Sequence, residues 1–172
     1  DPFETIITKV RSYRDLLQQK MEIMAQNGIN VFDRNYKAIS NTTPQKYTVS
    51  YNAAFDRELQ PIFEKALEEI PGTVYVLPVD VNGYLSTHVS MFQKPMTGNP
   101  EVDLLNSRHQ RFYFTNDTEK RRVKNTQPFL LQTYMRDNGD ILNDLSMPIY
   151  VNGTHWGALC VGIKPEILLQ DA

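Results

Sequence analysis

Arginines placed beside aromatic residues are the side chains of this sequence best suited to binding chemistry. Arg108 and Arg111 precede the aromatic run Phe112 to Phe114. Further along, Arg136 follows Tyr134 near the end of an apolar stretch. A guanidinium group binds a planar carboxylate through two parallel hydrogen bonds, and tyrosine hydroxyls complete such pockets. The spacing therefore favours a site for a small carboxylate, such as an organic acid.

A structural role for two of these arginines stays open beside the binding role. Arg108 and Arg111 come just after a long connection that contains Asp103, and Asp80 closes an earlier apolar stretch. Salt bridges from the arginines to either carboxylate would tie the connection down. In that interpretation the two guanidinium groups act as a latch and contact no ligand.

The sequence gives little support for a metal site or for catalysis. His88, His109 and His155 lie on separate segments, without the i,i+4 spacing of a helical zinc pair. The sequence holds no nucleophile-elbow motif, phosphate-binding glycine loop or dinucleotide fingerprint. The single cysteine, Cys160, excludes a CxxCH motif and so excludes covalent c-type haem; a buried, inert thiol is expected there. We expect no enzyme, no metal and no cofactor.

The amino-acid composition and net charge limit the kinds of partner that we expect for this chain. The 172 residues are 41% hydrophobic and 22% charged, which is ordinary for one globular domain. A net charge of −2 gives no case for nucleic acid as a partner. The basic cluster from Lys120 to Lys124 is expected to be a solvated loop or helix face. No apolar run approaches the roughly 20 residues that span a bilayer, so we expect a soluble protein or a piece from between membrane segments.

Turn signals indicate how the chain folds back on itself. The pairs Asn82-Gly83, Asn138-Gly139 and Asn152-Gly153 each lie between apolar stretches. Asn-Gly tolerates the positive φ that a type I′ hairpin needs at both central positions. The second half of the chain is therefore predicted to be antiparallel sheet. The expected strands cover residues 73–80, 84–88, 111–115, 130–136, 141–150 and 155–163.

Helical spacing dominates the first half. Apolar residues recur by threes and fours from Phe3 to Gln26, which predicts one long amphipathic helix that either lies on the sheet or pairs with a copy of itself. A second helical stretch runs from Asn52 to Ile70, and Pro61 must kink or divide it. The connection from Val89 to Asn106 is broken by prolines and is expected to close over the sheet as a lid. Trp156 beside Gly157 is expected in the core.

Four blocks of sequence carry a family resemblance. They run from Val79 to His88, from Asn106 to Tyr113, from Tyr134 to Gly139 and from Asp144 to Gly157. With these blocks in this order, nearly the whole chain resembles the extracytoplasmic Cache-type sensor domains, a PAS-like fold, of bacterial methyl-accepting chemotaxis proteins. The closing stretch from Val161 to Ile163 resembles the end of their final hairpin.

The resemblance implies an α+β fold, namely a single Cache domain with a long N-terminal helix and a central antiparallel sheet of five to six strands. Residues 1–28 would be a dimerisation and signalling helix and residues 29–172 the sensor domain, together one structural unit. It further implies an inner-membrane receptor whose periplasmic domain binds a small solute, forms a homodimer and moves its first helix when the lid closes. Membrane segments would flank this stretch of chain.

The resemblance and the arginine pattern together suggest a set of ligand-binding residues. These are Tyr84, His88, Arg108, Arg111, Tyr113, Tyr134, Arg136 and Ser146. Lys164 follows the last strand, where amino-acid-binding relatives carry an acidic residue, so an amino acid is disfavoured. Three alternatives stay open: a ligand-free dimerisation module, a sensor for a histidine kinase or cyclase, and non-covalent haem held by a histidine.

Overall fold

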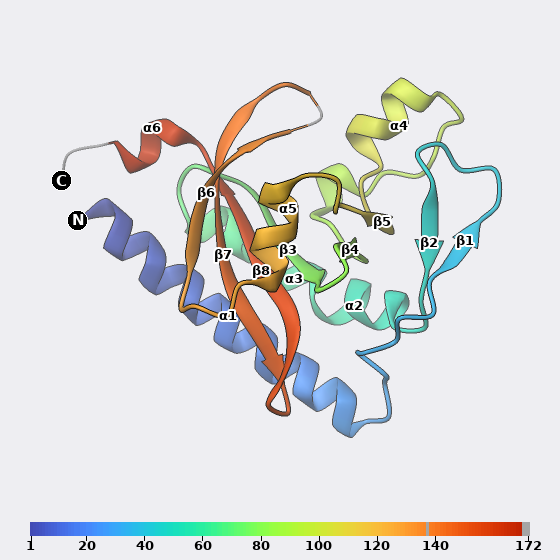
Figure 1. Cartoon of the computed structure of the whole chain (residues 1–172), viewed down its shortest axis with the longest axis horizontal. Coiled ribbons are helices and arrows are strands. Elements are labelled where there is room, and N and C mark those ends of the chain that lie inside the picture. Colours follow the sequence, from blue (N-terminus) through green and yellow to red (C-terminus); the bar gives the residue numbers. More distant parts are fainter. Residues whose placement is uncertain (137, 170–172) are drawn as a thin grey trace.

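A four-stranded antiparallel sheet organises the molecule, described by a computed structural model over residues 1–136 and 138–169. Its order is β3-β8-β7-β6, as Figure 1 shows. The strands are β3 (Thr73–Asp80), β6 (Leu130–Met135), β7 (Ile141–Val151) and β8 (Thr154–Ile163). The predicted α+β class is confirmed, and the architecture is compatible with a PAS-like fold. Asp137 and residues 170–172, the end of the predicted 29–172 domain, lie outside the described residues.

The predicted sheet of five to six strands is wrong, because the described residues place four strands in the central sheet. The remaining strands form two separate two-stranded sheets. One pairs β1 (Lys37–Ile39) with β2 (Lys46–Thr48), in a stretch without a clear strand pattern. The other pairs β4 (Tyr84–Leu85) with β5 (Arg111–Phe112).

The turn at Asn82-Gly83 explains this difference. Gly83 has φ of 84°, but the Asp80 carbonyl accepts from the Gly83 N–H at 2.9 Å, and Asp80 Oδ1 accepts from the Asn82 and Tyr84 N–H groups. The chain thus turns away from β3, which pairs with β8 instead. At Asn152-Gly153, in contrast, both φ angles are positive (51° and 80°), and β7 and β8 form the predicted tight hairpin.

The helices of the first half agree with the sequence pattern. The first, α1 (Pro2–Gln26), begins at the N-cap Asp1, whose side chain accepts from the Phe3 N–H. The second stretch is divided into α2 (Asn52–Glu58) and α3 (Gln60–Glu69), with Pro61 in the first turn of α3. Within the described residues, no helix combines the length and the apolar character that a bilayer crossing requires.

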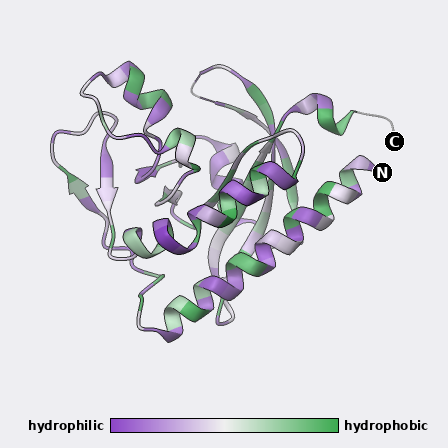
Figure 2. Ribbon diagram, turned by 180° about the vertical axis from the view of Figure 1, so that it is seen from behind, coloured by the Kyte–Doolittle hydropathy of each residue, from purple (hydrophilic) through white to green (hydrophobic). Residues whose placement is uncertain are grey.

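The apolar stripe of α1 lies against the sheet. Figure 2 shows hydrophobic and hydrophilic residues alternating along this helix as it crosses the sheet. Its buried residues join one core with the inward residues of α3, β7 and β8: Ile6, Ile7, Val10, Tyr13, Leu17, Met21 and Met24. Arg14 donates to the Pro148 carbonyl at 2.9 Å, and Gln18 accepts from the Tyr150 N–H at 2.9 Å. Between the two predicted roles, the structure therefore assigns this stripe to the sheet.

Trp156 belongs to this core, as expected. It is almost fully buried, packs against Phe55 and donates its indole N–H to the Val31 carbonyl at 2.8 Å. A side chain at Gly157 would meet the Val79 carbonyl at 2.1 Å, so glycine permits the close approach of β8 to β3.

The connection from Val89 to Asn106 folds upon itself. It contains the short helices η1 (Ser90–Phe92) and α4 (Pro100–Asn106). Its two ends are joined, because the Arg108 N–H donates to the Phe92 carbonyl at 2.8 Å and the Lys94 N–H donates to the Asn106 carbonyl at 3.0 Å. The segment therefore forms a loop that leaves the sheet and closes on itself, as Figure 1 shows around α4.

Neighbouring leucines on α1 test how this helix is docked. Leu17 is 1% exposed and Leu16 is 37% exposed. We expect Leu17→Ala to lower the free energy of unfolding by about 2–5 kcal/mol, because it leaves a cavity in the core. Leu16→Ala, the matched control, should cost less than about 1 kcal/mol. Equal losses in urea unfolding would contradict packing of this stripe on the sheet.

Candidate functional site

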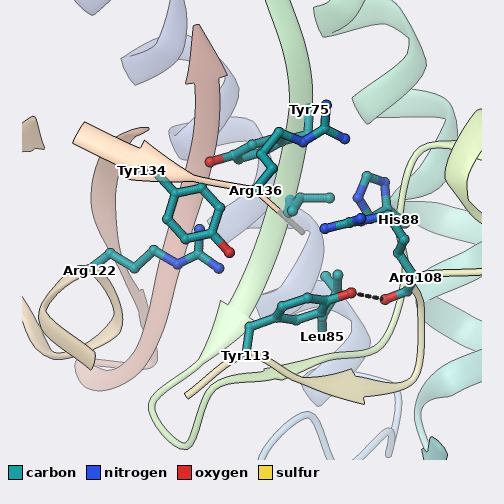
Figure 3. Close-up of a pocket in the computed structure, with 9 residues that line it drawn as sticks. Tyr75, Leu85, His88, Arg108, Tyr113, Arg122, Tyr134 and Arg136 are labelled. Carbon is teal, nitrogen blue, oxygen red and sulfur yellow. Dashed lines mark hydrogen bonds between the residues drawn. The ribbon is translucent and has the colours of Figure 1, made fainter. Parts of the chain in front are cut away.

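A small buried cavity lies on the face of the sheet opposite α1. Its volume is about 20 Å³, which is room for about one water molecule. Side chains from β3, β4, β6 and the helix α5 (Asp117–Lys124), together with the connections next to them, form its wall (Figure 3). The lining residues are Tyr75, Leu77, Leu85, His88, Arg108, Tyr113, Arg122, Tyr134 and Arg136.

The sheet provides the floor of the cavity. Tyr75 and Leu77 alternate along β3 and so point to the same face. A side chain at position 162 of β8 would come within 2.2 Å of the Tyr75 ring, so Gly162 allows that ring to lie across the sheet. Cys160 is buried on this face, as predicted, and burial raises the pKa of its thiol.

A buried ion pair joins α5 to the sheet. Arg122 Nη1 donates to Asp144 Oδ2 on β7 at 2.8 Å, and the Tyr75 hydroxyl donates to the same oxygen at 2.5 Å. The Arg122 guanidinium also lies 4.9 Å from the centre of the Tyr134 ring. Tyr134 in turn donates to Glu119 Oε2 of α5 at 2.7 Å. These contacts hold α5 over the face of the sheet that carries the cavity.

The basic cluster is therefore not simply a solvated face, and that prediction is wrong for Arg122. The Arg122 side chain is 2% exposed, whereas the adjacent Arg121 is 61% exposed. Glu119, Arg122 and Val123 are buried together on one side of α5. Their i, i+3, i+4 spacing was the signal that marks this face, and the strongly polar composition of the helix masked it.

The opposite wall carries two further guanidinium groups. Arg108 lies 5.9 Å from the centre of the Tyr113 ring, and the Tyr113 hydroxyl donates to the Arg108 carbonyl at 2.8 Å. Arg136, in the turn after β6, lies 5.1 Å from the centre of the Phe92 ring. Burial lowers the pKa of Arg136, and the positive charge of Arg108 adds to this effect. Arg136 Nη1 also lies 4.0 Å from Oδ2 of the exposed Asp140, which partly balances its charge.

His88 is a neutral member of this wall. Its Nδ1 accepts a hydrogen bond from the Val89 N–H at 2.8 Å, so the proton resides on Nε2. Burial holds the pKa of His88 well below its ordinary value of 6.5, and the charges of Arg108 and Arg136 lower it further. The imidazole thus offers one N–H donor and no charge.

The structure brings most of the predicted site residues together. His88, Arg108, Tyr113, Tyr134 and Arg136 line the cavity. Tyr75, Leu77, Leu85 and Arg122 also line it and were missed. Alternation along β3 could have indicated Tyr75 and Leu77 as residues of one face, but no motif marks them.

Three predicted residues lie outside the cavity lining. Arg111 donates to the Leu104 carbonyl of α4 at 3.1 Å, a contact of the latch type, and stacks 5.0 Å from the Tyr113 ring centre. Tyr84 donates to the Tyr47 carbonyl at 2.6 Å and belongs to the core on the α1 side. Ser146 is buried on β7, two residues from Asp144.

The predicted lid is also corrected. No residue between 89 and 106 lines the cavity within the described chain; the residues on either side of this connection, His88 and Arg108, do. The ends of the connection bond to each other, which directs α4 away from the sheet. The described residues also hold no group of three or more His, Cys, Asp or Glu side chains suited to a metal ion.

Comparisons with known proteins add little. No protein-family model matches the chain, and no curated protein matches it. A solved structure of an extracellular ligand-binding receptor from Desulfohalobium retbaense aligns with a TM-score of 0.49 and 14% identity. The alignment covers 96% of this chain and 25% of that one, so this chain spans about a quarter of the receptor's length. At this level the likeness assigns neither a family nor a ligand.

The ion pair predicts a large difference between two adjacent arginines. Arg122→Ala leaves the Asp144 carboxylate buried without its cation, so we expect the free energy of unfolding to fall by about 3–5 kcal/mol. Arg121→Ala, on the exposed side of α5, should change it by less than about 0.5 kcal/mol. Chemical denaturation of both variants measures this difference. A small loss for Arg122→Ala would show that the pair does not hold α5 in place.

The neutral His88 predicts a pH dependence of stability. Below about pH 6.5 a histidine in the unfolded chain takes up a proton that buried His88 does not, so wild-type stability falls as pH decreases from 7 to 5. His88→Asn keeps an acceptor for the Val89 N–H and should lose less stability over that range. The pKa of His109 is lowered to about 4 by burial and by Lys46, and it contributes the same slope to both proteins. Urea midpoints that shift equally in the two proteins would contradict a neutral His88.

Proposed function

We propose that this chain is the extracytoplasmic, ligand-binding sensor domain of a membrane receptor, of the PAS-like Cache type, and that it binds a small carboxylate between the sheet and α5. The observation that supports this most is the convergence of three buried guanidinium groups, from Arg108, Arg122 and Arg136, on one cavity. Guanidinium groups suit carboxylates by geometry as well as charge.

Charge supports an anion over a neutral or cationic solute. Asp144 already neutralises Arg122 within hydrogen-bonding distance. Arg108 and Arg136 lie on the opposite wall, and the positive charge of Arg108 lowers the pKa of Arg136. Arg136 Nη1 also lies 4.0 Å from Asp140 Oδ2, and a ligand carboxylate would accept further hydrogen bonds from the two guanidinium groups. Neutral His88 and the tyrosine hydroxyls would supply hydrogen bonds without adding charge.

Binding would open a cavity that is narrow in the unliganded chain. Its volume of about 20 Å³ is smaller than a carboxylic acid, so side chains must move outward when a ligand enters. Arg136 is suited to move, because it lies in the turn between β6 and β7. A ligand that binds the opened arrangement more tightly than the closed one shifts the population between them, which is the requirement for a sensor.

Strand β7 offers a route from the cavity to α1. Asp144 bonds the cavity wall, while Pro148 and Tyr150 of the same strand are hydrogen-bonded to Arg14 and Gln18 of α1. We propose that ligand binding moves β7 and shifts α1 by about 1–2 Å, replacing the lid closure expected from the sequence. Dimerisation through α1, flanking membrane segments and a chemotaxis output, with a kinase or cyclase output as the alternative, belong to the same proposal.

A second candidate is a protein-interaction or dimerisation module without a ligand. The observation that favours it is the small volume of the cavity, which the side chains of the protein itself nearly fill. The two functions differ in one property, because the interaction module would not be stabilised by any small solute.

A thermal-shift screen against organic acids, amino acids and purines separates the two functions. At 100 times Kd a bound solute adds about 2.7 kcal/mol to the stability. We expect small carboxylates to raise the melting temperature of the wild type. Arg136→Gln should abolish that rise, whereas Arg57→Gln, on the exposed surface of α2, should keep it. If no compound in the panel raised the melting temperature of the wild type, the interaction module would be favoured.

A further inference from the structure

The outer edge of β6 is an open side of the central sheet. β6 comes last in the strand order, and among the described residues no strand pairs with its other side. In the turn after the strand, the Arg136 N–H donates to the Asp140 carbonyl of the β7 side at 2.9 Å. Hydrogen-bonded residues alternate along an antiparallel pair, so the even-numbered residues of β6 bond to β7. The N–H and C=O groups of Leu131, Thr133 and Met135 therefore point outward, away from the sheet.

The two edges of the sheet differ in how they are protected. β3 forms the other edge, and it contains Pro78, which has no N–H group to donate to a further strand. Proline and charged side chains are the usual means by which edge strands avoid pairing with another chain. The sequence from Asn125 to Met135, which includes all of β6, has no charged residue. The outer edge of β6 thus lacks the features that discourage a second strand.

Apolar side chains accompany these outward backbone groups on one face of β6. Leu131 is 39% exposed and Met135 is 66% exposed. Ile141, which lies opposite Met135 on β7, is 53% exposed. The other face of the strand is occupied, since Gln132 donates to the Thr118 carbonyl of α5 at 3.0 Å. A strand that paired with β6 would cover the apolar side chains and satisfy the backbone groups at the same time.

We propose that β6 pairs in an antiparallel manner with β6 of a second copy of this chain, with a two-fold axis at Thr133. The axis places Leu131 of each copy opposite Met135 of the other, and it brings all three outward residues of both copies into the ladder. A copy suits this edge, because apolar side chains meet apolar ones and no like charges come to lie opposite each other. The contact uses neither α1 nor the cavity, so it is independent of the function proposed above.

Disulfide cross-linking tests this register. Cys160, the single cysteine of the chain, is buried, so a cysteine introduced on the surface reports contacts between copies. Thr133→Cys places two thiols opposite each other at the axis, where a Cα separation of about 5.5 Å permits a disulfide. Met135→Cys, on the same face of the same strand, places them at least about 13 Å apart and is the matched control.

We expect oxidation to convert Thr133→Cys into a covalent dimer on a non-reducing gel and to leave Met135→Cys mostly monomeric. Equal cross-linking of the two variants would show contacts without this register and would overturn the proposal. A dimeric wild type whose Thr133→Cys variant does not cross-link would also overturn it, since the copies would then meet at another surface.

Paired charges test the same contact by sedimentation. Leu131→Lys combined with Met135→Lys sets like charges opposite each other twice, whereas Leu131→Lys combined with Met135→Glu sets opposite charges there. We expect the second double variant to dimerise at least about tenfold more tightly than the first. Both positions are exposed, and circular dichroism checks that the variants are folded. Equal dissociation constants, or a wild type that stays monomeric up to about 1 mM, would overturn the proposed pairing.

Discussion

The buried contact between Arg122 and Asp144 is the interaction on which the arrangement of this molecule depends. Burying two charges is costly unless they pair closely, and here one guanidinium, one carboxylate and the Tyr75 hydroxyl meet within 2.5–2.8 Å. Through this contact α5 is fixed over β7 and β3. Without α5 in place, the tyrosines and arginines that surround the cavity would face solvent instead of one another.

The sheet separates two environments that serve different purposes. The face under α1 is an apolar core, and its packing determines the stability of the fold. The opposite face carries charged and aromatic side chains around a cavity. Among the described residues, some buried polar atoms on this face, such as Arg122 Nε and Asp144 Oδ1, have no hydrogen-bond partner. Strand β7 belongs to both faces, since Asp144 bonds Arg122 and Tyr75 of the cavity wall while Leu145 and Met147 pack in the core. This two-sided strand is why we propose it as the link between ligand and helix.

The sequence predicted those elements whose signal is local. The stripe of α1, the division of the second helix at Pro61 and the hairpin at Asn152-Gly153 follow from spacing and turn chemistry alone. Strand pairing is not local: β3 pairs with β8, over 70 residues later, so the hairpin expected at Asn82-Gly83 could not be excluded from that turn's own residues. Arg122 was missed because the polar composition of α5 masked the spacing of its buried face, and because its partner Asp144 lies 22 residues further along the chain. The arginine and tyrosine pattern located much of the cavity wall, whereas Arg111 and Tyr84 were assigned from motif position and lie elsewhere.

A crystal structure of the chain grown with a saturating small carboxylate, such as lactate, tests the central claim most directly. The account predicts electron density for the ligand between α5 and the sheet, with its carboxylate oxygens about 2.7–3.2 Å from guanidinium nitrogens of Arg108 and Arg136. Density for side chains alone in that space, or a carboxylate bound only elsewhere on the molecule, would contradict it.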